Sequence, residues 1–191
     1  MSPYPVRSDH RLLRGTHGGR IRLGQIAWYE VAPTVGAITA IHAAVTLDPI
    51  DPTLVNTALV TPDHPRLLTV KGNAASVAGD VVISGADANN RAITETVTLA
   101  GVAVVPTTRA FAQVFTVLLP PRGGLNNTVS VGTANVLGLL HALTADVRLH
   151  TTFDGAADLG TLAIHADVSK NLFTPAGTLD GTKVLRILYV V

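Results

Sequence analysis

The sequence contains no cysteine, few aromatic residues and little charge. Without cysteine the chain can form no disulfide, no thiolate nucleophile and no thiolate-bound metal site. Aromatic residues make up 4% of the chain, which disfavours proteins that bind sugars or single-stranded nucleic acid by stacking. Charged residues make up 14%, against about 25% in typical domains. An assembly subunit with a covered surface would show this shortage of charge, as would a compact monomer with a Thr- and Ala-rich surface; we favour the assembly.

The sequence motifs of common enzyme classes are also missing. The chain has no Gly-Xaa-Ser-Xaa-Gly nucleophile elbow and no Gly-Xaa-Gly-Xaa-Xaa-Gly dinucleotide pattern. The glycine-rich segment 14–19 lacks the Gly-Lys-Ser/Thr ending of a phosphate loop. We therefore predict that the protein is not an enzyme and has no catalytic residues, no cofactor and no small-molecule substrate.

The histidines are scattered, and no His-Xaa-Xaa-Xaa-His pair occurs. The densest group of possible metal ligands consists of His150, Asp154, Asp158, His165 and Asp167. Its spacing is that of a loop between two strands and its flanks, with Asp154-Gly155 as a turn. We interpret these residues as solvated loop side chains and predict no metal site, the alternative being a cation held by this loop.

No part of the sequence suggests a membrane or a secretion pathway. The first residues lack the apolar stretch of a signal peptide, and no run of about 18 apolar residues could span a bilayer. The net charge of +1 gives no general reason to expect binding to membranes or nucleic acid. We expect synthesis in a reducing cytoplasm.

Positive charge is concentrated at the beginning of the chain. Residues 1–24 have no strand or helix periodicity and cannot bury enough apolar surface to fold alone. Beside one acid, Asp9, this segment carries five arginines: Arg7, Arg11, Arg14, Arg20 and Arg22. We predict an extended basic N-terminal arm that binds an acidic neighbouring subunit. The alternative is a solvated tail whose charges aid solubility.

From residue 25 onward the pattern is one of short strands at spacings of about ten residues. Turn residues separate the segments that we predict as strands: 26–31, 35–47, 66–73, 80–86, 92–99, 109–119, 128–131, 145–152, 161–165 and 183–191. Only residues 134–143 could form a helix, which Gly138 would weaken. We predict an all-β fold, a β-sandwich or jelly-roll-like barrel, over residues 25–191. The apolar strand 184–191 should lie in the centre of a sheet.

The clearest local signal is a hairpin between the strands at 80–86 and 92–99. The turn between them is rich in Asp, Asn and Gly, which tolerate left-handed backbone conformations. One face of the second strand is Thr94, Thr96 and Thr98, and the other is Ile93, Val97 and Leu99. Glu95 interrupts the apolar face and must reach solvent, find a partner or carry out a task. We predict a charge that is buried or paired near a sheet edge.

Several of these strand-and-turn segments resemble a pattern in small virion structural proteins of tailed bacteriophages. The similar segments are 66–73 (RLLTVKGN), 78–85 (AGDVVISG), 92–99 (AITETVTL), 109–111 (RAF), 128–132 (TVSVG), 137–139 (LGL) and 179–183 (LDGTK). They fall between residues 35 and 191, so the arm lies outside the resemblance. The resemblance implies a non-enzymatic component of the particle, often associated with the head, and it carries over no catalytic residues.

We therefore expect a capsid decoration or auxiliary head protein located in the virion. Its expected partners are the major capsid protein or other virion subunits, and further copies of itself in a symmetric oligomer such as a trimer. The nearest alternative is a tail-tube, connector or baseplate component of the same kind of particle. A second alternative is a glycan-binding β-sandwich module, which the scarcity of aromatic residues disfavours.

Overall fold

A computed structural model describes residues 25–191 and the backbone of two short strands, β1 (Leu13–Arg14) and β2 (Arg20–Ile21), which pair with each other. Strands account for 50% of the chain and helix for 2%, so the prediction of an all-β fold of sandwich or barrel type is confirmed. The helical element of the described residues is a short 3-10 turn, η1 (Val168–Lys170). No helix in this part of the chain is long and apolar enough to cross a membrane.

The strands of residues 25–191 are β3 (Ile26–Val31), β4 (His42–Thr46), β5 (Thr53–Val55), β6 (Arg66–Gly72), β7 (Ala78–Ala86), β8 (Ala92–Ala100), β9 (Val105–Phe111), β10 (Gln113–Leu119), β11 (Thr128–Gly138), β12 (Arg148–Phe153), β13 (Ala156–Ala157), β14 (Thr161–Ala163), β15 (Leu172–Thr174) and β16 (Leu185–Val190). They form sheets in the orders β5-β10-β7-β8, β14-β15-β11-β6-β9 with β4 added to β11, and β13-β12-β16-β3.

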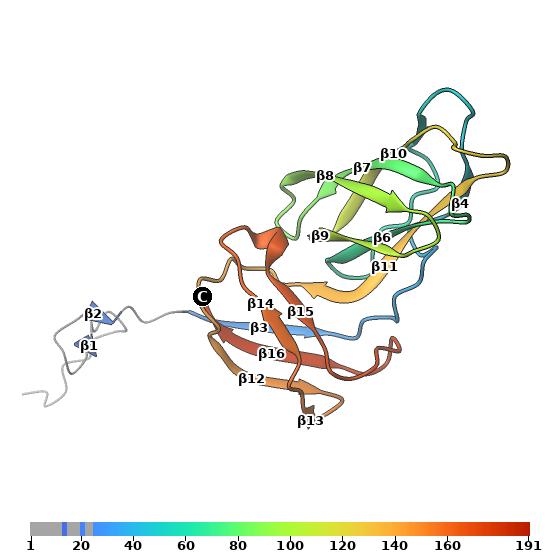
Figure 1. The fold of residues 1–191 in the computed structure, drawn as a ribbon. Helices are drawn as coiled ribbons and strands as arrows, with labels where there is room; N and C mark the ends of the chain where they lie inside the picture. Colours follow the sequence, from blue (N-terminus) through green and yellow to red (C-terminus); the bar gives the residue numbers. More distant parts are fainter. Residues whose placement is uncertain (1–12, 15–19, 22–24) are drawn as a thin grey trace, which may run out of the picture.

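The first half of the fold is a sandwich of β5-β10-β7-β8 against β9, β6, β11 and β4 (Figure 1). The sequence of β8 explains why this segment is a strand in the sandwich. Ile93, Val97 and Leu99 are buried, whereas the threonines between them are exposed. The predicted hairpin is present. Asp87 closes its turn by accepting hydrogen bonds from the backbone N–H groups of Asn89 (2.8 Å) and Arg91 (3.0 Å).

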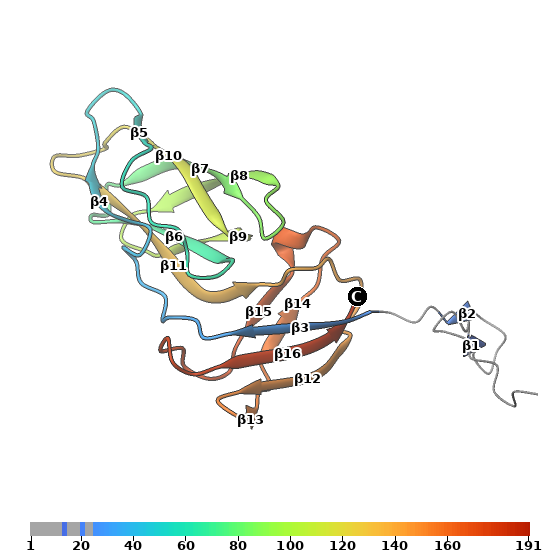
Figure 2. The same ribbon diagram turned by 180° about the vertical axis from the view of Figure 1, so that it is seen from behind.

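The second half places β14 and β15 across the sheet β13-β12-β16-β3 (Figures 1 and 2). Its core is a separate cluster that includes Tyr29, Phe173, Leu185, Ile187 and Tyr189. The last strand, β16, lies between β12 and β3, as predicted. Its residues alternate between buried and half-buried, so only one of its faces is fully covered.

The long strand β11 belongs to both halves. Val129 and Val131 near its beginning lie in the core of the first sandwich, whereas Leu137 near its end lies in the second core. Between Thr133 and Leu137 the register with β6 shifts, so β11 changes direction where the two cores meet. Residues 25–191 therefore fold around two clusters, and β11 contributes to both.

Some strand boundaries were predicted wrongly, and the one segment that could have formed a helix does not. Residues 134–143 form no helix, because β11 continues to Gly138, whose N–H donates to the carbonyl of Pro65 (2.7 Å). A side chain at position 138 would collide with Ala110, so glycine here permits close packing of strands. The strand expected from residue 35 begins only at His42. The strand expected over 109–119 is two strands that separate at Ala112.

A fully buried arginine, Arg66, holds together the segments at the junction of the two cores. Its guanidinium donates to the carbonyl of Ala134 in β11 (2.9 Å), to Asp63 Oδ1 (2.8 Å) and to the carbonyl of Thr34 (3.1 Å). Asp63 Oδ2 in turn accepts hydrogen bonds from the backbone N–H and the hydroxyl of Thr34, both at 2.8 Å. The cation is thus neutralised and hydrogen-bonded where water cannot reach it, as a buried charge requires.

Replacing Asp63 with asparagine should destabilise the protein strongly, because it leaves the buried charge of Arg66 without its counter-ion. We expect the free energy of unfolding in urea at pH 7 to fall by about 3 kcal/mol. Asp51→Asn, a change in an exposed loop, serves as the control and should shift stability by less than about 0.5 kcal/mol. Equal effects of the two substitutions would contradict this role of Asp63.

The same pair predicts a pH dependence of stability. Burial alone raises the pKa of Asp63, but hydrogen bonds from the Thr34 N–H and from Arg66 outweigh it and lower the pKa below its usual value. Such a carboxylate stabilises the fold above its unfolded pKa of about 3.9 and loses this contribution as the pH falls toward its folded pKa. Between about pH 4 and pH 2, urea midpoints of the wild type should therefore fall more steeply than those of Asp63→Asn. Parallel curves would contradict the expectation.

Candidate interaction surface

The outer side of the β12-β16-β3 sheet exposes an apolar face. Ile26 and Trp28 of β3 are 60% and 58% exposed. The antiparallel register places them beside Val190 and Leu188 of β16, both half-buried. Because alternate residues of a strand point to opposite faces, the residues between them line the core instead. We call Ile26, Trp28, Leu188 and Val190 the outer apolar face.

A polar contact lies along one end of the outer apolar face. Arg186 donates through Nε to Glu30 Oε2 (3.0 Å), and the Trp28 indole N–H donates to the same oxygen (3.0 Å). These two hydrogen bonds lower the pKa of Glu30 below its usual value. The carboxylate is thus neutralised by its neighbour across the strands, and it holds the Trp28 ring along the sheet.

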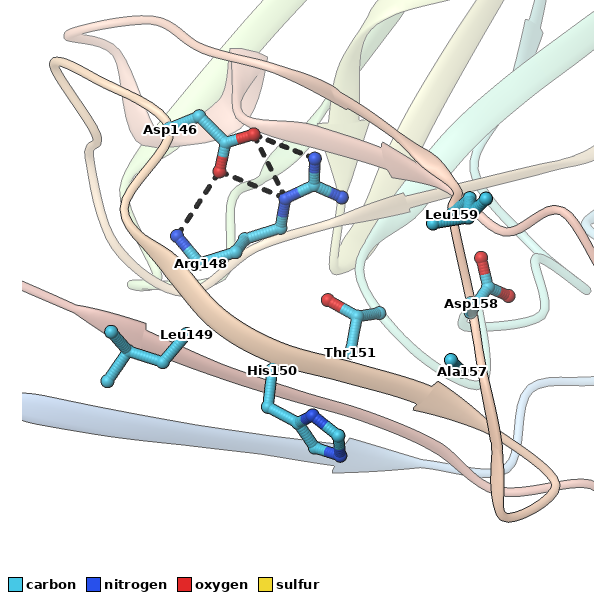
Figure 3. A pocket seen from close by; sticks show the side chains of 8 residues that line it. All are labelled: Asp146, Arg148, Leu149, His150, Thr151, Ala157, Asp158 and Leu159. Carbon is cyan, nitrogen blue, oxygen red and sulfur yellow. Dashed lines mark hydrogen bonds and ion pairs between the residues drawn. The ribbon is translucent and has the colours of Figure 1, made fainter.

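A hollow of about 540 Å³ lies beside β12, at the opposite edge of the same sheet (Figure 3). Asp146 and Arg148 form a close ion pair on one side of it, with 2.7 Å between Asp146 Oδ2 and Arg148 Nη2. Arg148 also donates to the carbonyl of Gly160 (2.8 Å) and lies 5.8 Å from the ring centre of Phe173. The hydrogen bond from Arg148 lowers the pKa of Asp146. The two charges neutralise each other and fasten the loop at 158–160 to β12.

The histidine and aspartate group at 150–167 is divided among separate structural tasks. Asp158 is buried and accepts hydrogen bonds from the N–H groups of Gly160 (2.5 Å) and Ala176 (3.1 Å). Asp167 caps η1 by accepting from Ser169 N–H (3.0 Å) and lies 3.5 Å from Arg109. His150 lines the hollow and is exposed. Among the described residues, no cluster of three or more His, Asp or Glu side chains is arranged to hold a metal ion.

Glu95 is half-buried and binds the backbone of another sheet. Its Oε1 accepts a hydrogen bond from the N–H of Thr108 (2.5 Å), and its Oε2 accepts one from the N–H of Arg109 (3.0 Å). Strand β8 ends the first sheet and β9 ends the second, so this carboxylate joins two sheet edges. Its partners are backbone amides, and the charge thereby covers N–H groups that β9 would otherwise leave unpaired at its edge.

The five arginines of the predicted arm lie outside the residues whose side chains the structure describes. Arg14 and Arg20 belong to the backbone pair β1 and β2. The outer apolar face was missed from the sequence. The signal for it was the single tryptophan two residues after Ile26, in a strand whose opposite face is apolar as well.

Comparisons with known proteins add no relative, since no protein-family model, no curated protein and no solved structure matches the chain.

Removing the carboxylate of Glu95 should weaken the contact between the two sheets. Glu95→Ala leaves the N–H groups of Thr108 and Arg109 without their acceptor, and we expect a loss of about 1–3 kcal/mol in urea unfolding. Thr96→Ala, an exposed change on the same strand, is the matched control and should have an effect within about 0.5 kcal/mol. If Glu95→Ala proves as mild as this control, Glu95 does not join the sheets.

Proposed function

We propose that this chain is a non-enzymatic structural subunit of a tailed-phage virion, acting as a capsid decoration or auxiliary head protein. The observation that carries the proposal is the outer apolar face, which exposes a tryptophan and an isoleucine on one side of a sheet. Exposed apolar groups that adjoin one another on a rigid surface are typical of sites that other proteins cover. The shortage of charge and the resemblance to small virion proteins support the same conclusion.

The loops after β4 and β10 lie at the far end of the molecule (Figure 1), and each exposes an apolar residue. Ile50 is 79% exposed and Leu125 is 82% exposed. The two loops are joined by a hydrogen bond from the N–H of Arg122 to the carbonyl of Asp48 (2.8 Å). Apolar surface at opposite ends suits a subunit that contacts more than one neighbour, because covering it stabilises the boundary between subunits.

The distribution of charge suggests how the arm contributes. Residues 1–24 carry five of the 14 Lys and Arg residues and one of the 13 acids. The rest of the chain therefore carries nine bases and twelve acids. A basic arm and an acidic body attract each other between neighbouring subunits, and this attraction weakens as salt is added. The arm would bind the shell or an adjacent subunit, whether of the major capsid protein or of the homo-oligomer.

The location of the protein in purified particles tests the proposal. Quantitative mass spectrometry of the particle should find it in hundreds of copies if it decorates the head. About a dozen copies would favour the connector or baseplate alternative, since such rings have low symmetry numbers. Imaging must then place the protein on the shell, because a tail tube also contains many copies. Absence from the particle would overturn the proposal.

Deleting residues 1–24 should abolish binding to particles while the remaining chain stays folded. A full-length variant with all five arm arginines replaced by glutamine should also lose most binding. The control replaces three bases of the body, Arg91, Arg122 and Lys170, with glutamine, and it should keep most binding. Occupancy is measured by gel densitometry after sedimentation, and folding by circular dichroism. Unchanged occupancy of the deletion variant would contradict the docking role of the arm.

A further inference from the structure

Among the strands that the structure describes, β3 is paired on one side only, and the backbone groups of its other, open edge can be identified from this pairing. Gln25 and Val191 exchange two hydrogen bonds, of 3.0 Å and 2.8 Å. In an antiparallel ladder such pairs recur at every second residue, so Gln25, Ala27, Tyr29 and Val31 direct their N–H and C=O groups toward β16. The backbone groups of the residues between them, Ile26, Trp28 and Glu30, therefore point away from the sheet.

Residues 26–31 lack the sequence features that normally prevent pairing between proteins. Exposed edges are usually blocked by lysine, proline, a bulge or a covering segment. Residues 26–31 contain neither lysine nor proline, and their register with β16 is continuous. The one charge, Glu30, is bound to Arg186. By contrast, Glu95 binds across the open edge of β8 to β9.

We propose that the open edge of β3 pairs with β3 of a second copy of this chain, antiparallel about a two-fold axis at Trp28. Trp28 then faces Trp28 of the second copy, and Ile26 of each copy faces Glu30 of the other. These three residues of each copy would form about six hydrogen bonds between the chains. The two sheets become one, and the two outer apolar faces become continuous. The pairing would hold whether or not the assembly is a virion.

A second copy can occupy this edge because the two-fold pairing brings no like charges together. The two Glu30 side chains would lie at opposite ends of the paired segment, about 14 Å apart, and each keeps its own Arg186. A two-fold interface uses the same patch on both subunits. The edge of β3 meets that condition, because the residue on the two-fold axis is the uncharged Trp28, which can face its own copy.

The paired edges alone make a small interface. A strand pair buries less than the about 800 Å² per partner that stable dimers bury. We therefore expect a weak dimer whose population rises with protein concentration.

Disulfide trapping tests the register directly, because the chain has no cysteine of its own. Residues paired on the two-fold axis have Cα atoms about 5.5 Å apart, within the range of a disulfide. Full-length Trp28→Cys should therefore form a covalent dimer on mild oxidation. Ile26→Cys is the matched control, equally exposed but about 14 Å from its copy, and should not. Equal trapping of both variants, or of neither, would overturn the proposal.

The mass and the fluorescence of the wild type give an independent test. Light scattering should show a mass of two chains, and the emission of the single tryptophan should shift to the blue as concentration rises. Trp28→Lys should raise the dissociation constant at least about tenfold, whereas Phe115→Lys, an exposed aromatic on another sheet, should not. A monomer at all concentrations, or a three-fold oligomer, would overturn this pairing. These measurements need no particle. The pairing can therefore fail while the virion proposal stands, and the virion proposal can fail while the pairing stands.

Discussion

The buried guanidinium of Arg66 is the constraint on which the two halves of the fold depend. It is fully buried at the point where β11 changes register with β6, and it binds the backbone of β11, the loop after β3 and the carboxylate of Asp63. A charge placed there can remain only if all of these partners stay together. The network therefore fixes how the second core is attached to the first, and with it the position of β3 and its outer apolar face.

The two halves differ in whether the edges of their sheets are bound, and the proposed assembly surface follows from this difference. In the first sandwich, β8 is next to β9 and Glu95 binds the amides there. In the second half, no described strand pairs with the outer edge of β3, and apolar side chains lie beside that edge. Unpaired backbone and exposed apolar surface thus coincide on one strand; pairing of two copies would satisfy the first, and a neighbour bound on the outer apolar face would cover the second. This agreement links the proposed structural role to the proposed pairing of two copies.

What the sequence predicts well is local. The alternation of Ile93, Val97 and Leu99 with threonines is sufficient to predict β8, and Glu95 is conspicuous because it breaks that alternation. The extra length of β11 was not predictable, since its second part is held by pairs with β6 and β15 that lie far away in sequence. The burial of Arg66 depends on three distant acceptors, and the exposure of Trp28 depends on which side of its sheet remains uncovered. Neither leaves a periodic signal in its own neighbourhood.

The pairing of β3 with β16 also sets the order in which the chain can fold. Glu30 and Arg186, which face each other in this pair, are 156 residues apart in sequence. The strands of the first sandwich join partners much closer to them, as in the β7–β8 hairpin, and such contacts form quickly. During synthesis β3 therefore stays unpaired on both edges until β16 has left the ribosome. Until then β3 can pair with any other strand edge that meets it. The edge suited to assembly is therefore also the point where premature association would begin.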